Sequence, residues 1–296
     1  MLRTQYDQTV RLVRQPDHAV AAGHMAAHWG NEEFTKIGYF DNCEDQKKLS
    51  EETIFGIAEH DNGWWEWEAS PSNSESDKLP RGLSEVLRNP TEATMRWKIG
   101  ISRFEETHPY GTLLTNLHAY RLYRAEINEE IHPLFVGSKS IGGKESPEAT
   151  SLVETLKKQQ DRIKQHLEKL GGWHKDAVKP EILQPHARLT QILDALSLAL
   201  CSDLIPPVSG KAKGLGQDEI EFHHIPRKSW EDRINVHITP KGNNTLEFDP
   251  FPFDEDNLVV PIIVTEIDAA RQEEITLSEL YKIPRKIVEF TFQISK

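Results

Sequence analysis

The sequence predicts a mainly helical α+β protein in which a helical bundle is followed by a small antiparallel β layer. Helical spacing of apolar residues dominates from Thr91 onward, up to about Ser202. After Pro206-Pro207 the pattern changes to short runs of β-branched and aromatic residues separated by Pro, Gly, Asn and Asp. Helices followed by strands, without regular βαβ alternation, are typical of α+β folds.

The N-terminal part is expected to hold one strand and two helices. Residues 8–14 alternate polar and apolar side chains, as a short strand does. Residues 17–29 and 50–61 are predicted helices, because each begins with an Asp or Ser that can cap its N-terminus. Asn62-Gly63 then supplies a helix stop. Residues 64–88 are rich in Ser, Pro, Asp and Gly, which indicates a long surface loop.

The remaining chain divides into helices and then strands. Helices are predicted over residues 91–106, 110–131, 147–170 and 185–202. Strands are predicted over residues 234–239, 245–248, 258–264 and 288–294. The chain is therefore divided into a helical domain, residues 1–206, and a β-rich region, residues 207–296, that packs on it. The strand at 8–14 is a candidate member of the same β layer.

Composition and charge exclude several functional classes. The net charge is −12, whereas binding to nucleic acid or to an anionic membrane needs a surplus of Lys and Arg. Two cysteines, Cys43 and Cys201, are too few for a disulfide framework, so a reducing cytoplasmic location is expected. No run approaches the roughly 20 apolar residues that span a bilayer. The oligomeric state stays open.

The adjacent pair His60-Asp61 is the first candidate for chemistry. Neighbouring residues on an ideal helix point about 100° apart, so two such ligands cannot share one ion there. At the end of a helix both side chains can turn towards one ion, and the carboxylate of Asp61 can bridge two. The dipeptide alone also fits a simple helix C-terminus, where His60 interacts favourably with the helix dipole.

Three other ligand-type residues are predicted to face inward. His18 lies on an apolar stripe of its helix, and His118 has Leu114 and Leu122 one turn away on either side. Asp194 lies within an apolar stretch of the last helix. A buried carboxylate is costly unless a cation or a hydrogen-bonding partner lies beside it. One metal site explains the inward-facing residues of all four helices together.

The order His18, His60-Asp61 and a distant Asp194 resembles the HD superfamily of metal-dependent phosphohydrolases. The resemblance implies an HD-like helical bundle in which these residues bind a divalent metal. It adds His118 as a ligand for a second ion, with Asp61 as the bridge, and gives Asp61 and His118 the catalytic roles. A second resemblance, to an uncharacterised bacterial family allied to this superfamily, extends over nearly the whole chain. Its stretches are QPDHA (15–19), EHDNGW (59–64), NLHAYRL (116–122), LDALSL (193–198) and DPFPF (249–253).

The predicted ligands narrow the choice of metal. Imidazole and carboxylate without thiolate suit Fe, Mn, Zn, Ni or Mg, as one or two ions. Such a metal would generate hydroxide from bound water at neutral pH and polarise a phosphoryl oxygen. The leading hypothesis is therefore a phosphohydrolase that acts on a small phosphorylated compound or nucleotide. The alternatives are an HD-type di-iron oxygenase and a non-catalytic protein that binds a metal or another ligand.

Three residues are candidates for binding the substrate. Arg121 and Arg124 follow His118 on the same helix and could reach a phosphate, although a solvated or ion-paired helix surface is the commoner explanation of such residues. Trp64 could form a stacking rim at the site, or pack the loop that follows it. His186 lies about 80° from Asp194 around the helix and is an outside candidate for the ligands or a base.

Overall fold

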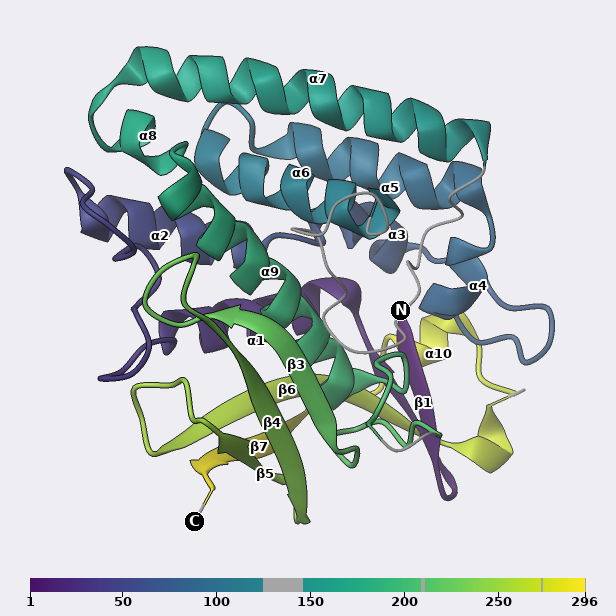
Figure 1. Cartoon of the computed structure of the whole chain (residues 1–296). Helices are drawn as coiled ribbons and strands as arrows, with labels where there is room; N and C mark the ends of the chain where they lie inside the picture. The colour runs from purple at the N-terminus through teal and green to yellow at the C-terminus, as the bar shows by residue number, and fades with distance from the viewer. Residues whose placement is uncertain (125–145, 209–210, 273, 296) are drawn as a thin grey trace.

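A layer of helices packs on one large β-sheet in the computed structural model (Figure 1). The structure describes residues 1–124, 146–208, 211–272 and 274–295. The helices and helical turns are α1 (Gln15–Ala27), α2 (Gln46–Ala58), η1 (Asn62–Trp64), α3 (Trp65–Ala69), α4 (Leu83–Leu87), α5 (Pro90–Arg103), α6 (Pro109–Arg124), α7 (Pro147–Leu170), α8 (Gly172–Ala177), α9 (Pro180–Cys201), η3 (Ala269–Arg271) and α10 (Leu277–Leu280).

The strands form a single seven-stranded sheet in the order β1-β2-β6-β7-β5-β4-β3. Their bounds are β1 (Leu2–Tyr6), β2 (Thr9–Val13), β3 (Ile220–Pro226), β4 (Arg233–Gly242), β5 (Thr245–Asp249), β6 (Asn257–Asp268) and β7 (Lys286–Ile294). Neighbouring strands run antiparallel except β5 and β7, which pair in parallel. The sheet is therefore mixed.

The prediction of a helical bundle with a small antiparallel β layer is wrong. The sheet is a substantial layer of mixed topology, and the helices do not form a bundle with a small antiparallel addition. Two of its strands, β1 and β3, were not expected from the sequence. Strand β1 pairs with β2, and β2 pairs with β6 through Leu12 and Thr265, so both N-terminal strands extend the sheet formed by the C-terminal part.

Helices α1 and α9 lie between the sheet and the outer helices, among them α6 and α7 (Figure 1). Every residue of α9 from Pro185 to Cys201 is buried, so the helix is covered on all sides and not only along one apolar stripe. One apolar cluster joins Met25 of α1 and Ile192 of α9 to Phe222 and Val260 of the sheet. Polar residues of α9 therefore point into the interior and need partners there.

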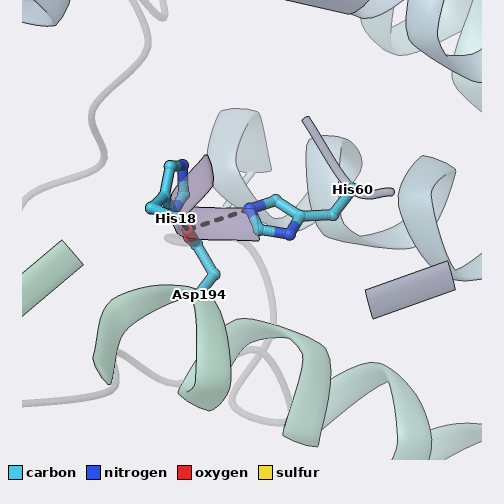
Figure 2. A group of neighbouring side chains, drawn as sticks. All are labelled: His18, His60 and Asp194. Atoms are coloured by element: carbon cyan, nitrogen blue, oxygen red, sulfur yellow. Dashed lines mark hydrogen bonds and ion pairs between the residues drawn. The ribbon is translucent and has the colours of Figure 1, made fainter. Parts of the chain in front are cut away.

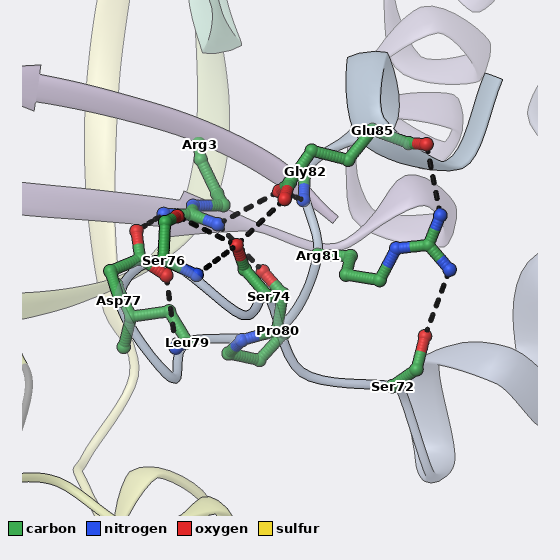
Figure 3. A network of polar contacts seen from close by, with 10 residues as sticks. All are labelled: Arg3, Ser72, Ser74, Ser76, Asp77, Leu79, Pro80, Arg81, Gly82 and Glu85. Atoms are coloured by element: carbon green, nitrogen blue, oxygen red, sulfur yellow. Dashed lines mark hydrogen bonds and ion pairs between the residues drawn. The ribbon is translucent and has the colours of Figure 1, made fainter. Parts of the chain in front are cut away.

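The segment after Trp64 is more ordered than the predicted surface loop. It contains α3 and α4, and a polar network attaches it to β1 (Figure 3). Arg3 of β1 pairs with Asp77 and, at 3.1 Å, with Glu85, whose other carboxylate oxygen accepts a hydrogen bond from Ser74 at 2.7 Å. These contacts hold α4 against the body of the protein.

Several helix limits differ from the prediction. Helix α2 begins four residues before Ser50, because the carboxylate of Asp45 accepts the backbone N–H of Lys48 and acts as the cap. Helix α9 begins at Pro180 and continues through Pro185. Helix α7 has the predicted limits. None of the helices in the described ranges combines the length and the apolar composition that a membrane crossing requires.

Candidate metal centre

The pair His60-Asp61 lies in a turn and not within a helix. Helix α2 ends at Ala58, and η1 begins at Asn62. Asn62 fixes the turn, since its amide N–H groups donate to the carbonyl oxygens of Glu59 (2.7 Å) and Gly100 (3.3 Å). In this turn His60 and Asp61 are not held to the angular spacing of a helix, so both can face the interior.

The backbone of Gly63 packs directly against α5. A Cβ on this residue would overlap the carbonyl oxygen of Arg96 and lie 3.0 Å from the backbone nitrogen of Gly100. Only glycine allows this approach. The contact sets how the turn, and with it His60-Asp61, sits over the other helices.

The structure brings together all five predicted metal ligands. They come from α1, the turn after α2, α6 and α9, and all are buried: His18, His60, Asp61, His118 and Asp194. Nε2 of His18 lies 3.0 Å from Oδ2 of Asp61, and Nε2 of His60 lies 3.1 Å from Oδ1 of Asp194. Nε2 of His118 lies 3.4 Å from the other oxygen of Asp194. Figure 2 shows His18, His60 and Asp194 converging.

Outer contacts fix the proton position on two of the imidazoles. His60 donates from Nδ1 to the carbonyl oxygen of Ile57 at 2.8 Å. His18 donates from Nδ1 to Oγ of Ser197 at 2.9 Å, and Ser197 donates in turn to the carbonyl oxygen of Asp194 at 2.8 Å. In the neutral form, both rings therefore carry their proton on Nδ1 and present the lone pair of Nε2 to a carboxylate.

A lone pair and a carboxylate about 3 Å apart repel each other unless a positive charge lies between them. Burial disfavours the charged form of His60, but the carboxylates of Asp194 and Asp61 outweigh burial and raise its pKa to about 9. Burial would also raise the pKa of Asp194, yet His60 and His118 hold it well below its usual range. The cluster is thus built to contain a cation, which can be a proton or a metal ion.

The donors are also suitable for a metal. Small divalent ions bind N and O ligands at about 2.1 Å, which places neighbouring ligands about 3 Å apart. The separations of 3.0 and 3.1 Å match this spacing. Among the described residues, His18, His60 and Asp194 form a buried group close enough to share one ion. A second such group, His28, Asp254 and Glu255, is largely exposed.

A cavity adjoins the cluster. Its volume is about 60 Å³, within a recess of about 520 Å³ that includes open solvent. The polar residues of its lining are Gln15 and four of the predicted ligands, all but His60. The other walls are apolar or aromatic: Trp64, Leu83, Leu87, Trp97, Leu122, Tyr123 and Leu198. Trp64 lines the cavity and also belongs to a buried apolar cluster with Trp67 and Val86 of the segment that follows it, so both roles considered for this side chain stay predictions.

Of the two predicted substrate-binding arginines, Arg121 lies away from the cavity. Arg121 is buried and donates to the side-chain oxygens of Gln184 and Gln191, but it does not line the cavity. The side chain of Arg124, at the end of α6, falls outside the described residues. The structure thus does not bring Arg121 to the cavity beside the cluster.

His186 belongs to a separate buried network. Its Nε2 accepts the backbone N–H of Gly38 at 3.0 Å, so the proton lies on Nδ1 and is donated to Oη of Tyr110 at 2.8 Å. Burial lowers the pKa of His186 to about 3, and the ring is neutral. It holds the segment before α2 against α6 and α9 and is not part of the cluster.

Sequence reasoning missed Gln15, Trp97 and Ser197. Gln15 lies within the stretch QPDHA one turn before His18, and Ser197 lies one turn after Asp194, so helical spacing from the ligands could have identified both. The ring of Trp97 lies 5.7 Å from that of His118. Its position depends on the packing of α5 against α6, for which the sequence carries no comparable signal.

The comparisons with known proteins identify a family without a known activity. The family model described as "Protein of unknown function (DUF3891)" matches residues 1–269. No curated protein and no solved structure matches the chain.

Proposed function

We propose that this chain, which belongs to the family described as "Protein of unknown function (DUF3891)", is a divalent-metal-dependent phosphohydrolase of HD type. The expected resemblance to an uncharacterised family is thereby confirmed. The link to the HD superfamily is a proposal that rests on the order His18, His60-Asp61, Asp194.

One observation carries the proposal. The lone pairs on Nε2 of His18 and His60 are fixed by hydrogen bonds at Nδ1 and face carboxylate oxygens at 3.0 and 3.1 Å. Hydrogen bonds from the outer ring nitrogen are the usual way in which proteins prepare histidines for a metal. Buried carboxylates facing two such lone pairs would be unfavourable without a cation.

The chemistry divides between the metal and the chain. A bound divalent metal lowers the pKa of a coordinated water and polarises a phosphoryl oxygen. His18, His60 and Asp194 would hold the ion together with Asp61, and all four except His60 also line the cavity. His118 lines the cavity and its Nδ1 has no hydrogen-bond partner, so it can exchange a proton with a substrate oxygen.

The substrate is proposed to be a small phosphorylated compound or nucleotide. The polar lining residues can bind a phosphoryl oxygen, while the apolar and aromatic lining residues fit a compact organic group. Arg121 does not line the cavity and is not part of this proposal. The phosphoryl group itself is inferred from the HD resemblance.

The test is phosphate release by purified protein loaded with Mn, Mg, Zn, Ni or Fe. The substrates are p-nitrophenyl phosphate and a panel of nucleoside mono-, di- and triphosphates. Asp61→Ala should reduce the rate by about 100-fold or more, because even the outer partners of metal ligands contribute roughly 10–100-fold. His28→Ala is the matched control, since His28 and Asp254 form an exposed pair with a 3.0 Å separation. This variant should keep the wild-type rate.

Two other results would favour the alternative functions. Bound iron with a ferric absorption band and oxygen consumption, without phosphate release, would favour the di-iron oxygenase. Metal-free protein whose melting temperature is unchanged in His60→Ala would leave a non-catalytic ligand-binding protein. Equal phosphate release by wild type and Asp61→Ala would contradict the proposed site.

A further inference from the structure

The side chain of Gln15 is buried beside the cluster without a hydrogen-bond partner. Gln15 is 0% exposed, and both Nε2 and Oε1 of its amide are unpaired. Six buried side-chain polar atoms lack partners in the described part of the chain, and two of them belong to this one residue. Buried amides are normally satisfied, so a fully unpaired amide calls for an explanation.

The backbone of Gln15 is held firmly while its side chain is not. The backbone N–H donates to Oε1 of Glu68 at 3.0 Å, and Pro16 follows at the start of α1. His18 lies one turn further along the same helix. The position of Gln15 relative to the metal cluster is thus fixed by the helix.

Gln15 also lines the cavity. His118, whose Nδ1 is unpaired, lines the same cavity. Gln15 and His118 together carry three of the six unsatisfied atoms. The lining also includes the aromatic residues Trp64 and Trp97. Unpaired polar atoms around a recess with aromatic walls are the arrangement expected of a binding site.

We propose that Gln15 is a ligand-binding residue that recognises an amide-like edge, with a donor beside an acceptor, on a planar or apolar body. A carboxamide pairs with such an edge through two hydrogen bonds, as Gln does with a nucleobase. The indoles of Trp64 and Trp97 supply the apolar surface on which a planar ring can pack. The same edge occurs in nucleobases and in simple carboxamides.

This inference rests on the proposed function in one respect, because it takes the neighbouring cluster as the place where the bound ligand reacts. For the ligand of a phosphohydrolase, it narrows the organic part to a group with an amide-like edge. Binding can be measured without turnover, so an experiment can contradict either proposal and leave the other standing.

The test titrates isotope-labelled protein with benzamide, uracil and toluene and follows the indole N–H signals of Trp64 and Trp97 by NMR. Gln15→Met removes the amide and keeps the unbranched shape, and Gln15→Leu serves if that variant does not fold. Gln46→Met, on α2 and away from the cavity, is the matched control. The metal content and phosphate release of the same samples test the proposed function independently.

Benzamide or uracil should shift both indole signals in wild type and in Gln46→Met. Gln15→Met should weaken that binding about tenfold or more, because a site that loses its hydrogen-bonding group discriminates strongly. Toluene should bind equally to all three proteins. Binding of uracil alone would indicate a nucleobase, and binding of benzamide alone a simple carboxamide. Unchanged affinity in Gln15→Met, or no binding of either amide by wild type, would overturn the proposal.

Discussion

The chemistry of the site depends on where single protons lie. Ile57 and Ser197 hold the protons of His60 and His18 on Nδ1, and this leaves each Nε2 free for a cation. A serine hydroxyl and a backbone carbonyl, neither of them a ligand, thereby decide what the histidines can bind. Without a metal, the favourable state is a protonated His60 between Asp61 and Asp194.

This state predicts how the stability of the metal-free protein varies with pH. The pKa of His60 is raised from 6.5 to about 9, so its contribution is fully present below pH 6.5 and is lost as the pH rises through 9. The loss should approach about 3 kcal/mol of unfolding free energy. Urea denaturation in the presence of EDTA measures it.

His60→Gln is the control for this titration, because it removes the group and should remove the slope between pH 6.5 and 9. Metal binding should show the opposite trend and strengthen over the same range, since the ion competes with the proton. An identical pH dependence in wild type and His60→Gln would contradict this account of His60.

Residue type explains which parts of the site could be predicted. His18, His118 and Asp194 were found because ligand-type residues on apolar stripes are unusual and need partners. Gln15 and Ser197 lie one helical turn from a predicted ligand, but they were missed because glutamine and serine occur at many such positions without a function. What distinguishes Gln15 is that its amide has no partner, and this is visible only in three dimensions.

At the scale of elements, the turn between α2 and η1 determines the site. Helix α2 ends at Ala58, three residues earlier than predicted, so His60 and Asp61 lie beyond its last turn. Asn62 and Gly63 were expected to act as a simple helix stop. Instead, both pack against α5, which fixes the turn more firmly than a local cap would.

Gly63→Ala should therefore destabilise the protein by about 3 kcal/mol, in the range known for overpacking a tight contact. The added methyl group would meet backbone atoms of α5, which cannot rotate away. Metal affinity should fall together with stability, because the same displacement moves His60 and Asp61. Chemical denaturation and a metal titration measure the two effects.

Gly82→Ala is the matched control. Gly82 has φ −69°, and an added Cβ would lie 3.4 Å from its nearest neighbour, the side chain of Arg3. Its effect should stay within about 1 kcal/mol, with metal binding unchanged. A Gly63→Ala protein as stable as Gly82→Ala would show that the contact with α5 does not position the turn.

At the scale of the whole molecule, the order of strands was beyond what the sequence reveals. Runs of β-branched and aromatic residues identified most strands of the C-terminal part, but they carry no information about which strands become neighbours. Strand β7 enters between β6 and β5 and runs parallel to β5, so the sheet is mixed and not antiparallel as predicted. Strand β1 adds an edge that depends on pairing with β2.

The shared core predicts that the helical part does not fold alone. Helices α1 and α9 contribute to the same apolar cluster as Phe222, Val260 and Phe292 of the sheet. A chain ending at residue 206 would expose this face and should lack fixed tertiary structure, while the full chain should unfold in one transition. Near-ultraviolet circular dichroism and thermal denaturation compare the two. A folded 1–206 fragment with its own transition would instead support the predicted division at that residue.

The metal content of the purified chain tests the central claim most directly. Elemental analysis should find one or two divalent ions per wild-type chain, as the proposed metal-assisted hydrolysis requires. Asp194→Asn should lose them, because an amide cannot replace the buried carboxylate that faces His60 and His118. Asp254→Asn, which alters the exposed group, should retain them. Metal-free wild type that takes up no added ion, or Asp194→Asn with the wild-type metal content, would contradict the proposed metal centre.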